Sequence, residues 1–256
     1  MGILNLTEDS FFEGGKYTTT DLALKHTEKM LKEGAMFIDV GAASSKPGSK
    51  LITAAEENKI LMPILEVLLQ NFPETYFSID TYNSEVAKES LIRGVSMIND
   101  ISGGGIDPKM IQTVAAFRVP YVMMHMQGSP ENMQQHPHYV QITSEIKSQF
   151  IEKVQLAMAK GVNDVIIDPG FGFGKTLAHN FQLLNEMNVL EDLRCPILVG
   201  VSRKSMIYKT LKGSPETALN GTTALHAWAL DRGASILRVH DVKEAKECVD
   251  LFSALQ

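Results

Sequence analysis

Short runs of apolar and β-branched residues recur along this chain at intervals of roughly 20 to 40 residues, with segments of helical periodicity between them. This alternation is typical of repeated strand–helix units, in which the strands form a parallel sheet. Eight such runs are present, at residues 2–6, 36–41, 76–81, 96–101, 121–126, 164–168, 197–201 and 235–239. Because eight parallel strands close a barrel, the pattern predicts an α/β fold, a single (β/α)8 TIM barrel.

The segments between these runs carry helix signals. Thr53 begins a Thr-Ala-Ala-Glu sequence, which is a possible capping box, and it is followed by an apolar stripe at Leu61, Ile64, Leu65 and Leu68. Several helices are expected to end at a glycine just before the next strand, at Gly34, Gly94, Gly161 and Gly233. An open, doubly wound sheet has the same alternation and is the structural alternative. Eight units in 256 residues, with no linker, favour one barrel domain over residues 1–256.

Composition excludes several classes of partner. The formal net charge is -6, so no sequence-wide basic field exists to attract nucleic acid or an anionic membrane. No apolar run approaches the roughly 18 to 20 residues of a membrane span, and no export signal precedes the first strand. The lone cysteines, Cys195 and Cys248, are expected to be buried thiols in a reducing cytoplasm. Histidines on the predicted helices, at His26, His179 and His226, are expected at the surface.

Polar residues stand near the C-terminal end of almost every predicted strand. In chain order they are Asn5, Asp39, Asp80, Asn99 with Asp100, His125, Asp168, the run 202–205, and Arg238 with His240. A single polar ending is also explained by turns and helix caps. The chemistry of a barrel is built from these positions, and buried charges are costly unless they pair with each other or with a ligand. The set as a whole therefore predicts an active site at the C-terminal ends of the strands.

The mixture of charges in this set indicates the kind of ligand. Acidic and amide groups follow the middle strands, whereas cations follow the last two strands and the second one. A two-ended ligand would suit them. One end would present several N–H donors in a plane, as an aminopyrimidinone does, and the other would be anionic, as phosphate is.

Eight motifs, one for each predicted strand, together resemble the dihydropteroate synthase family. They are GILNLTEDSF (2–11), DVGA (39–42), SIDT (78–81), INDI (98–101), MHMQG (124–128), DPGFGFGK (168–175), SRKS (202–205) and RVHD (238–241). The resemblance covers nearly the whole chain in order. It implies a TIM barrel that joins 6-hydroxymethyl-7,8-dihydropterin pyrophosphate to p-aminobenzoate, with Mg2+ on the pyrophosphate. A cytoplasmic homodimer with only small-molecule substrates is also implied.

The resemblance assigns a role to each matching position. Pterin binding falls to Asp80, Asn99, Asp168, Lys204, Arg238, Ile101, Met124 and Gly200. Pyrophosphate binding falls to Asn5, Lys46, Arg238, His240 and Asp39, with Asn5 also the magnesium ligand. The p-aminobenzoate pocket corresponds to Phe11, Ser45, Pro47, Phe173, Lys204 and Ser205. The residues matched to catalysis are Lys204, Arg238, Asp9 and Phe11.

The family also implies loops that close over the site, here at residues 7–16 and 42–50. This chain departs from the family pattern in both. Glu8 stands where proline is usual, Glu13 where aspartate is usual, and Lys46 where arginine is usual. Because lysine cannot make the bidentate phosphate contact of arginine, the departure at Lys46 bears on loop closure and not on pterin binding.

Two other functions fit part of the pattern. A pterin-binding methyltransferase domain shares the barrel and the Asp and Asn contacts, but it has no pyrophosphate to bind. Lys204, Arg238 and His240 therefore favour the synthase, and pyrophosphate release on mixing both substrates would discriminate the two. A non-catalytic pterin-binding protein is the other alternative, which tight ligand binding without product would indicate.

Overall fold

The computed structural model describes residues 1–6, 19–44 and 48–255. In chain order its elements are β1 (Gly2–Asn5), α1 (Thr19–Lys32), β2 (Phe37–Gly41), α2 (Ala54–Asn71), β3 (Tyr76–Asp80), α3 (Ser84–Ile92), β4 (Met97–Asp100), α4 (Met110–Phe117), β5 (Tyr121–Met124), α5 (Ile142–Ala159), β6 (Val165–Asp168), α6 (Leu177–Asn185), the 3-10 helix η2 (Met187–Leu193), β7 (Ile197–Val199), α7 (Ser205–Thr210), α8 (Leu219–Asp231), β8 (Ala234–Leu237) and α9 (Val242–Ser253). The predicted alternation of strands and helices is confirmed, and each strand lies within a residue or two of its predicted run.

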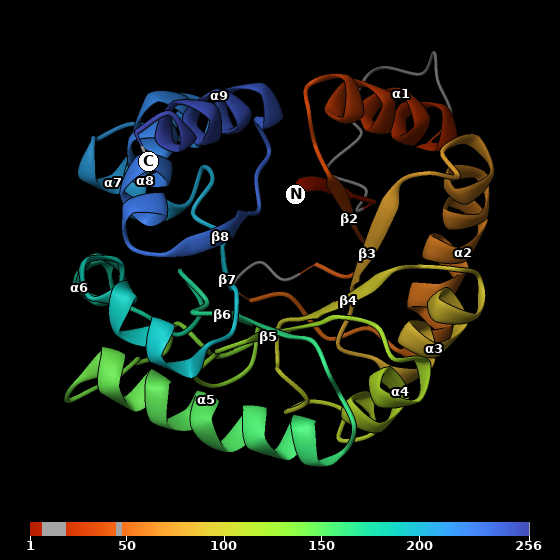
Figure 1. The fold of residues 1–256 in the computed structure, drawn as a ribbon, viewed down its shortest axis with the longest axis horizontal. Coiled ribbons are helices and arrows are strands. Elements are labelled where there is room, and N and C mark those ends of the chain that lie inside the picture. The colour runs from red at the N-terminus through yellow and green to blue at the C-terminus, as the bar shows by residue number, and fades with distance from the viewer. Residues whose placement is uncertain (7–18, 45–47, 256) are drawn as a thin grey trace.

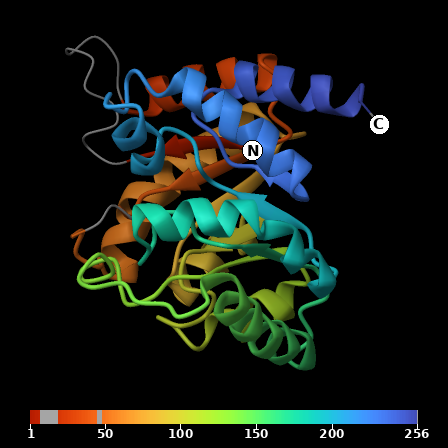
Figure 2. The ribbon, with the colours of Figure 1, turned by 90° about the vertical axis from the view of Figure 1, so that its left-hand side faces the viewer.

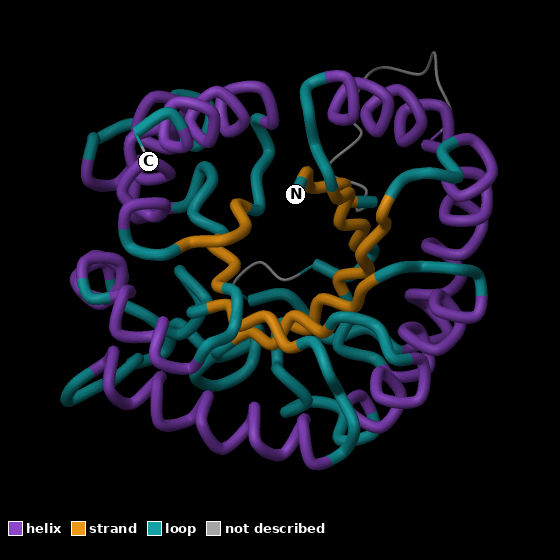
Figure 3. The backbone as a smooth tube through the Cα atoms, viewed as in Figure 1, coloured by secondary structure: helices purple, strands orange, loops and turns teal. Residues whose placement is uncertain are grey.

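Parallel strands follow one another around the molecule in sequence order, from β1 to β8. Figure 1 looks along the axis of this curled sheet, and Figure 3 shows the strands as an inner ring surrounded by helices. The ring is closed by an isolated parallel bridge between Gly2 and Val239, in which the Ile3 N–H donates to the Val239 carbonyl at 3.0 Å. The predicted barrel is therefore confirmed, and the open doubly wound sheet is excluded.

Alternation along the strands separates two apolar regions. Side chains on one face of each strand pack against the helices in the large outer core, for example Ile38, Ile98 and Ile167. The residues next to them in sequence point the other way, because successive strand side chains alternate. They form a separate cluster inside the barrel, which consists of Met97, Val122, Ile166 and Leu198 with Met1, Phe37 and Ile236 packed against it. This cluster fills the barrel below the strand ends.

The helix signals identified in the sequence are present in the structure. Thr53 and Glu56 form a reciprocal capping box at the start of α2, where the Thr53 N–H donates to Glu56 Oε2 at 2.8 Å. The stripe on α2 is buried against the barrel, at Leu61, Ile64, Leu65 and Leu68. Each glycine expected to end a helix has a positive φ, between 92° and 99° for Gly34, Gly94, Gly161 and Gly233. The helix starts and ends predicted from local sequence therefore coincide with those in the structure.

The expectation for one histidine is wrong. His226 lies on α8 with only 1% of its surface exposed, facing the core. Burial lowers the pKa of His226 to about 4, so the ring is neutral and tolerated there. Cys195 and Cys248 are buried free thiols, as predicted. Among the described residues, no helix is long and apolar enough to cross a membrane.

The loops that follow the strands gather at one end of the barrel. In the side view of Figure 2 the long segment after β5, residues 125–141, lies at the left edge of the molecule. At the same end Asp100, the last residue of β4, accepts bonds from the N–H groups of Ser102 and Gly104, each at 2.8 Å. The Tyr121 hydroxyl donates to Asp100 at 2.7 Å in a buried position. Asp100 therefore shapes the turn after β4 from the outer side.

Removing the Tyr121 hydroxyl should destabilise the barrel. Tyr121→Phe leaves the buried Asp100 carboxylate without one donor, which should lower the free energy of unfolding by about 1.5 to 3 kcal/mol. Tyr76→Phe is the control, because Tyr76 is 58% exposed and its change should stay within about 0.5 kcal/mol. Urea denaturation of the two variants measures the difference. Equal stabilities would contradict the role of Asp100.

Candidate functional site

A row of polar side chains lies directly above the apolar cluster inside the barrel. Asp39, Asn99, Asp168 and Arg238 each follow by two positions a residue of that cluster, on β2, β4 and β6 and just after β8. Because strand side chains alternate with a period of two, these residues face the same interior. Met124 and Gly200 occupy the equivalent positions on β5 and just after β7. The barrel therefore converts six distant sequence positions into one ring of side chains.

Arg238 is the centre of a hydrogen-bonded network across this ring. Its Nε donates to Asp39 Oδ2 at 2.6 Å, and its Nη2 donates to Asp80 Oδ2 at 2.8 Å. Asp39 Oδ2 also accepts from the Asn99 amide at 2.9 Å. The guanidinium group thus joins β2 to β3, and Asn99 on β4 belongs to the same network through Asp39. The nearby carboxylates raise the pKa of Arg238 despite the opposing effect of burial, which keeps its charge permanent.

Asp39 and Asp80 differ in exposure. Asp39 is completely buried, and both of its hydrogen-bond partners are members of the predicted site. The structure places the Asp39 carboxylate against Arg238 and Asn99, and its contact with pyrophosphate stays a prediction. The Asp80 side chain keeps 13% of its surface exposed. Burial raises the pKa of Asp80 to about 7, and Arg238 opposes the rise.

Gly41 brings β2 close to the Asp80 side chain. A Cβ at Gly41 would lie 3.3 Å from Asp80 Cβ, which is tighter than an ordinary contact. A side chain at the end of β2 would therefore require Asp80 to shift by a few tenths of an ångström. The glycine is therefore part of the geometry of the site.

Asp168 and Lys204 form the second half of the site. Asp168 ends β6, and its Oδ1 accepts the N–H of Gly170 at 2.7 Å. Burial raises the pKa of Asp168, while the Lys204 ammonium lowers it. Burial lowers the pKa of Lys204 to about 8, and Asp168 opposes that shift. Lys204 donates to the Phe171 carbonyl and lies 4.6 Å from the centre of the Phe173 ring.

An apolar cluster flanks these charges. It consists of Tyr82, Ile101 and Met124, with Phe173 packed against it. Each of the first three is less than 5% exposed. Such a surface can contact the face of a flat ring while the polar groups bind its edge.

His240 is oriented by a serine that the sequence analysis assigned no role. Its N–H donates to the Ser202 hydroxyl at 3.2 Å, and the hydroxyl lies 3.0 Å from His240 Nδ1. The hydroxyl can donate its proton to Nδ1, and in that tautomer the Nε2–H of the ring remains available as a donor. Ser202 precedes Lys204 in the same motif, and its position just after β7 was the available signal.

Other predicted residues have different placements. Arg203, in the same run as Lys204, has a φ of 54° and forms two bonds with Asp241 at 2.7 and 2.8 Å, so its charge is already neutralised. Asn5 is exposed at the end of β1, paired in register with Gly41. Ser205 is the first residue of α7. The predicted residues Asp9, Phe11, Ser45, Lys46 and Pro47 lie outside the described residues.

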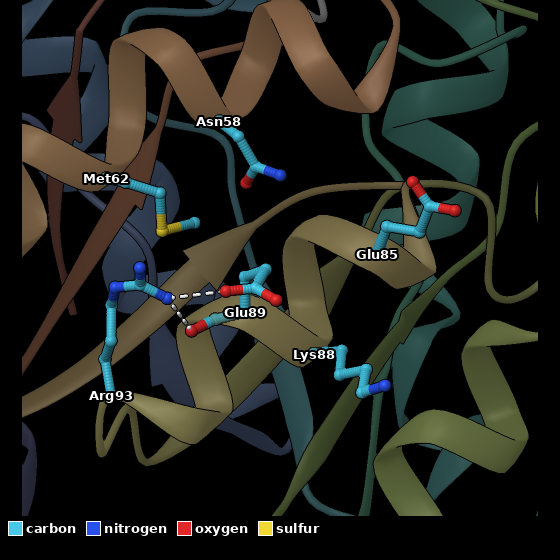
Figure 4. A pocket seen from close by; sticks show the side chains of 6 residues that line it. All are labelled: Asn58, Met62, Glu85, Lys88, Glu89 and Arg93. Carbon is cyan, nitrogen blue, oxygen red and sulfur yellow. Dashed lines mark hydrogen bonds and ion pairs between the residues drawn. The ribbon is translucent and has the colours of Figure 1, made fainter.

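A surface groove elsewhere on the protein does not involve these residues. It lies between α2 and α3 and is lined by Asn58, Met62, Glu85, Lys88, Glu89 and Arg93 (Figure 4). Arg93 is already bound to Glu89 at 2.8 Å and to Glu66 at 3.1 Å. Asp39, Asp168 and Arg238 gather with their partners at the strand ends, so the candidate site is placed there. Within the described residues no group of three or more His, Cys, Asp or Glu side chains is arranged to hold a metal ion.

Comparisons with known proteins show which proteins this chain is similar to. The family model described as "Pterin binding enzyme" matches residues 1–240. The dihydropteroate synthase of Escherichia coli is 40% identical over 99% of this chain and 90% of its own length. The structure of Yersinia pestis dihydropteroate synthase with a sulfonamide drug is 40% identical with a TM-score of 0.93, covering 99% of this chain and 92% of that one. Xanthomonas albilineans dihydropteroate synthase with 4-aminobenzoic acid is 37% identical with a TM-score of 0.92, covering 100% and 92%.

Neutralising Asp39 should destabilise the protein more than neutralising a surface carboxylate. Asp39→Asn leaves the partly buried Arg238 charge with one partner fewer, which should cost about 3 kcal/mol in unfolding free energy. Glu66→Gln removes an ion pair whose carboxylate side chain is 54% exposed, and it should cost under about 1 kcal/mol. Denaturant titrations of both variants test the contrast. Similar losses for the two would show that Asp39 does not hold Arg238 in place.

Proposed function

Because the chain belongs to the dihydropteroate synthases of the pterin-binding enzyme family, we propose how its own residues carry out that reaction. The substrates would be 6-hydroxymethyl-7,8-dihydropterin pyrophosphate and p-aminobenzoate, and the products 7,8-dihydropteroate and pyrophosphate. One observation carries the proposal. Asp80 and Asp39 both accept from Arg238, and Asn99 donates to Asp39, at the barrel end where burial raises the pKa of Asp168 and the Lys204 charge lowers it.

The pterin would lie with its edge toward the acidic and amide groups. Asp168 can accept a ring N–H and an exocyclic amine together, and Asp80 and Asn99 extend the hydrogen bonding along the heterocycle. Lys204 would donate to the carbonyl edge of the ring. A charged two-point contact of this kind discriminates against ligands that lack the donors. The faces of the ring would contact the apolar cluster of Ile101 and Met124 and the guanidinium plane of Arg238.

The reaction breaks the C–O bond between the pterin methylene carbon and pyrophosphate and forms a C–N bond to the arylamine. Pyrophosphate leaves with the electron pair, which leaves a methylene cation stabilised by the pterin. Arg238 and His240, in the tautomer that carries its proton on Nε2, would stabilise the charge developing on the leaving group. The amine of p-aminobenzoate then captures the carbon, and its proton leaves after bonding. No nucleophilic side chain is required.

The p-aminobenzoate pocket would adjoin the pterin through Phe173, Lys204 and Ser205. Lys204 and Phe173 lie side by side, so one ammonium group can contact both substrates. Ser205 lies at the N-terminus of α7. The remaining pocket residues, Phe11, Ser45 and Pro47, stay predictions, as do catalysis by Asp9 and phosphate binding by Lys46.

Mg2+ would be the cofactor, with Asn5 as its protein ligand. The exposed side chain at the end of β1 offers an amide oxygen, the type of ligand that Mg2+ prefers. A site with one protein ligand, completed by phosphate oxygens and water, is ordinary for this ion. When bound, Mg2+ would neutralise charge on the pyrophosphate.

We also propose a cytoplasmic homodimer. Helix α7 contacts both α6 and α8, and large exposed apolar side chains lie along this surface, at Leu177 on α6, Leu211 directly after α7 and Trp228 on α8. Such side chains on adjoining helices are suited to a subunit interface. Buried free thiols at Cys195 and Cys248 suit a reducing compartment.

The assay that tests this function mixes both substrates with the purified protein. Dihydropteroate and pyrophosphate should appear in equal amounts with Mg2+, and neither should form in quantity when a chelator is added.

Asp168→Ala should abolish pterin binding, because the two-point acceptor is lost. Product measured by chromatography and binding measured by calorimetry separate the two steps. Tight pterin binding without product would identify a non-catalytic homologue, and product without magnesium dependence would remove Asn5 from its assigned role.

Pterin affinity should fall as pH rises through about 8, because burial lowers the pKa of Lys204 to about that value. Below it the protonated amine donates fully to the pterin, and above it the charge is lost. Dissociation constants from about pH 6 to about pH 10 measure the effect. Lys204→Gln should bind weakly without this alkaline decline, whereas exposed Lys209→Gln should retain the wild-type profile. If Lys204→Gln shows the same loss of affinity at alkaline pH, the loss is caused by the titration of another group.

A further inference from the structure

A second buried ammonium group, that of Lys175, lies next to the site but does not face the proposed substrates. Lys175 is 3% exposed. Its Nζ donates to the carbonyls of Gly170 and Phe173 at 2.9 and 3.0 Å, and it lies 3.0 Å from His125 Nδ1. Burial lowers the pKa of Lys175 to about 7, and Asp168 opposes the shift. This cation is thus held by backbone carbonyls and a ring nitrogen.

The loop between β6 and α6 is fixed almost entirely by side-chain donors. Each of its carbonyls from residue 170 to residue 175 accepts such a bond, and the donors are Lys175 for Gly170 and Phe173, Lys204 for Phe171, Gln134 for Gly172, Tyr139 for Gly174 and Asn180 for Lys175. A loop without strand or helix pairing must satisfy its backbone in this way. Lys175 is the donor that serves two of these carbonyls at once.

Close backbone contacts show that this loop is docked against the end of β5. A Cβ at Gly170 would lie 1.9 Å from the His125 carbonyl oxygen, and one at Gly174 would lie 2.4 Å from the Gln127 carbonyl oxygen. Both glycines have positive φ values, 70° and 63°. The backbone of the loop therefore lies directly against the backbone after β5. The ammonium group of Lys175 lies at this contact, where it donates to the Gly170 carbonyl. It also lies 3.4 Å from the His125 carbonyl, so it joins the loop to the segment after β5.

The geometry points to Lys175 as a positioning residue, whose buried ammonium group joins the β6–α6 loop to His125 and thereby fixes Asp168 and Phe173 for substrate binding. The link to Asp168 runs through Gly170, which donates its N–H to the carboxylate and accepts from Lys175 at its carbonyl. The link to Phe173 is direct. This inference rests on the proposed function, because it concerns how the pterin and p-aminobenzoate contacts of that site are held.

His125 has a supporting part in this arrangement. Burial lowers the pKa of His125 to about 2, and the Lys175 charge adds to the effect, so the ring is neutral. Nδ1 accepts from Lys175, and the ring packs near Phe150 and Tyr139. His125, predicted from its position to belong to the site, therefore acts beneath it.

Lys175→Met tests the inference, since it keeps a long apolar stem and removes every donor. In hydrogen exchange measured by mass spectrometry, amides of residues 169–176 should exchange faster, with little change elsewhere. The Kd of pteroic acid should rise about tenfold or more, because small misplacements of binding groups have large effects. Ile64→Ala on α2 is the matched control, since it leaves a core cavity across the barrel from this loop. It should lower thermal stability yet leave loop exchange and pteroic acid affinity near wild type.

Tyr139→Phe provides a second, nearly isosteric variant, which loses only the donor to Gly174 at 3.0 Å. It should show the same local exchange and a smaller loss of affinity, and it replaces Lys175→Met in the comparison if that variant does not fold. Wild-type exchange and affinity in the folded variants would overturn the inference. Absence of dihydropteroate synthesis by the wild-type protein would instead refute the proposed function. The hydrogen-exchange result would still report whether Lys175 holds the loop.

Discussion

The site depends on the pairing of charges inside a barrel that offers them little water. Asp39 has no exposed surface, and Arg238 keeps only 18% of its side chain exposed, so each would be costly alone. Their contact at 2.6 Å offsets part of that cost and sets the guanidinium direction, because Nε is held while Nη2 reaches Asp80. Asn99 is oriented by the same carboxylate oxygen. A buried ion pair thus places three groups at the mouth of the barrel before any ligand arrives.

Most of the fold could be predicted because its signals are local and periodic. The apolar runs, the capping box at Thr53 and the glycines after the helices each depend on neighbours in the chain, and the structure confirms them. Eight parallel strands in order leave few topologies. The position of the site also follows from periodicity, since Asp39, Asn99 and Asp168 occur two residues after apolar positions that fill the barrel interior. A period of two, read from the sequence, therefore groups these residues on one face of the sheet, and the structure shows that this face is the interior one.

What could not be predicted depends on which side of a strand or loop a polar residue faces. Asp100 and Asn99 are adjacent in sequence, yet Asn99 joins the Arg238 network while Asp100 binds Tyr121 on the outer side. His226 has the sequence context of a surface helix but packs into the core. Arg203 and Lys204 are adjacent cations, and the positive φ of Arg203 directs it to Asp241 and away from the site. These side-chain orientations are determined by tertiary packing, which cannot be read from the local pattern of a single sequence.

The β6–α6 loop has no regular structure of its own, yet it positions Asp168 and Phe173, two residues proposed to contact the substrates. Lys204 donates to the Phe171 carbonyl of this loop, so binding a pterin carbonyl would exchange one acceptor for another. Only the difference between the two contacts contributes to affinity. That difference is favourable only if the loop stays in place when Lys204 turns to the ligand. The bonds from Lys175 to Gly170 and Phe173 do not involve the ligand and can persist through this exchange. A second lysine beneath the first therefore allows the first to move without releasing the loop.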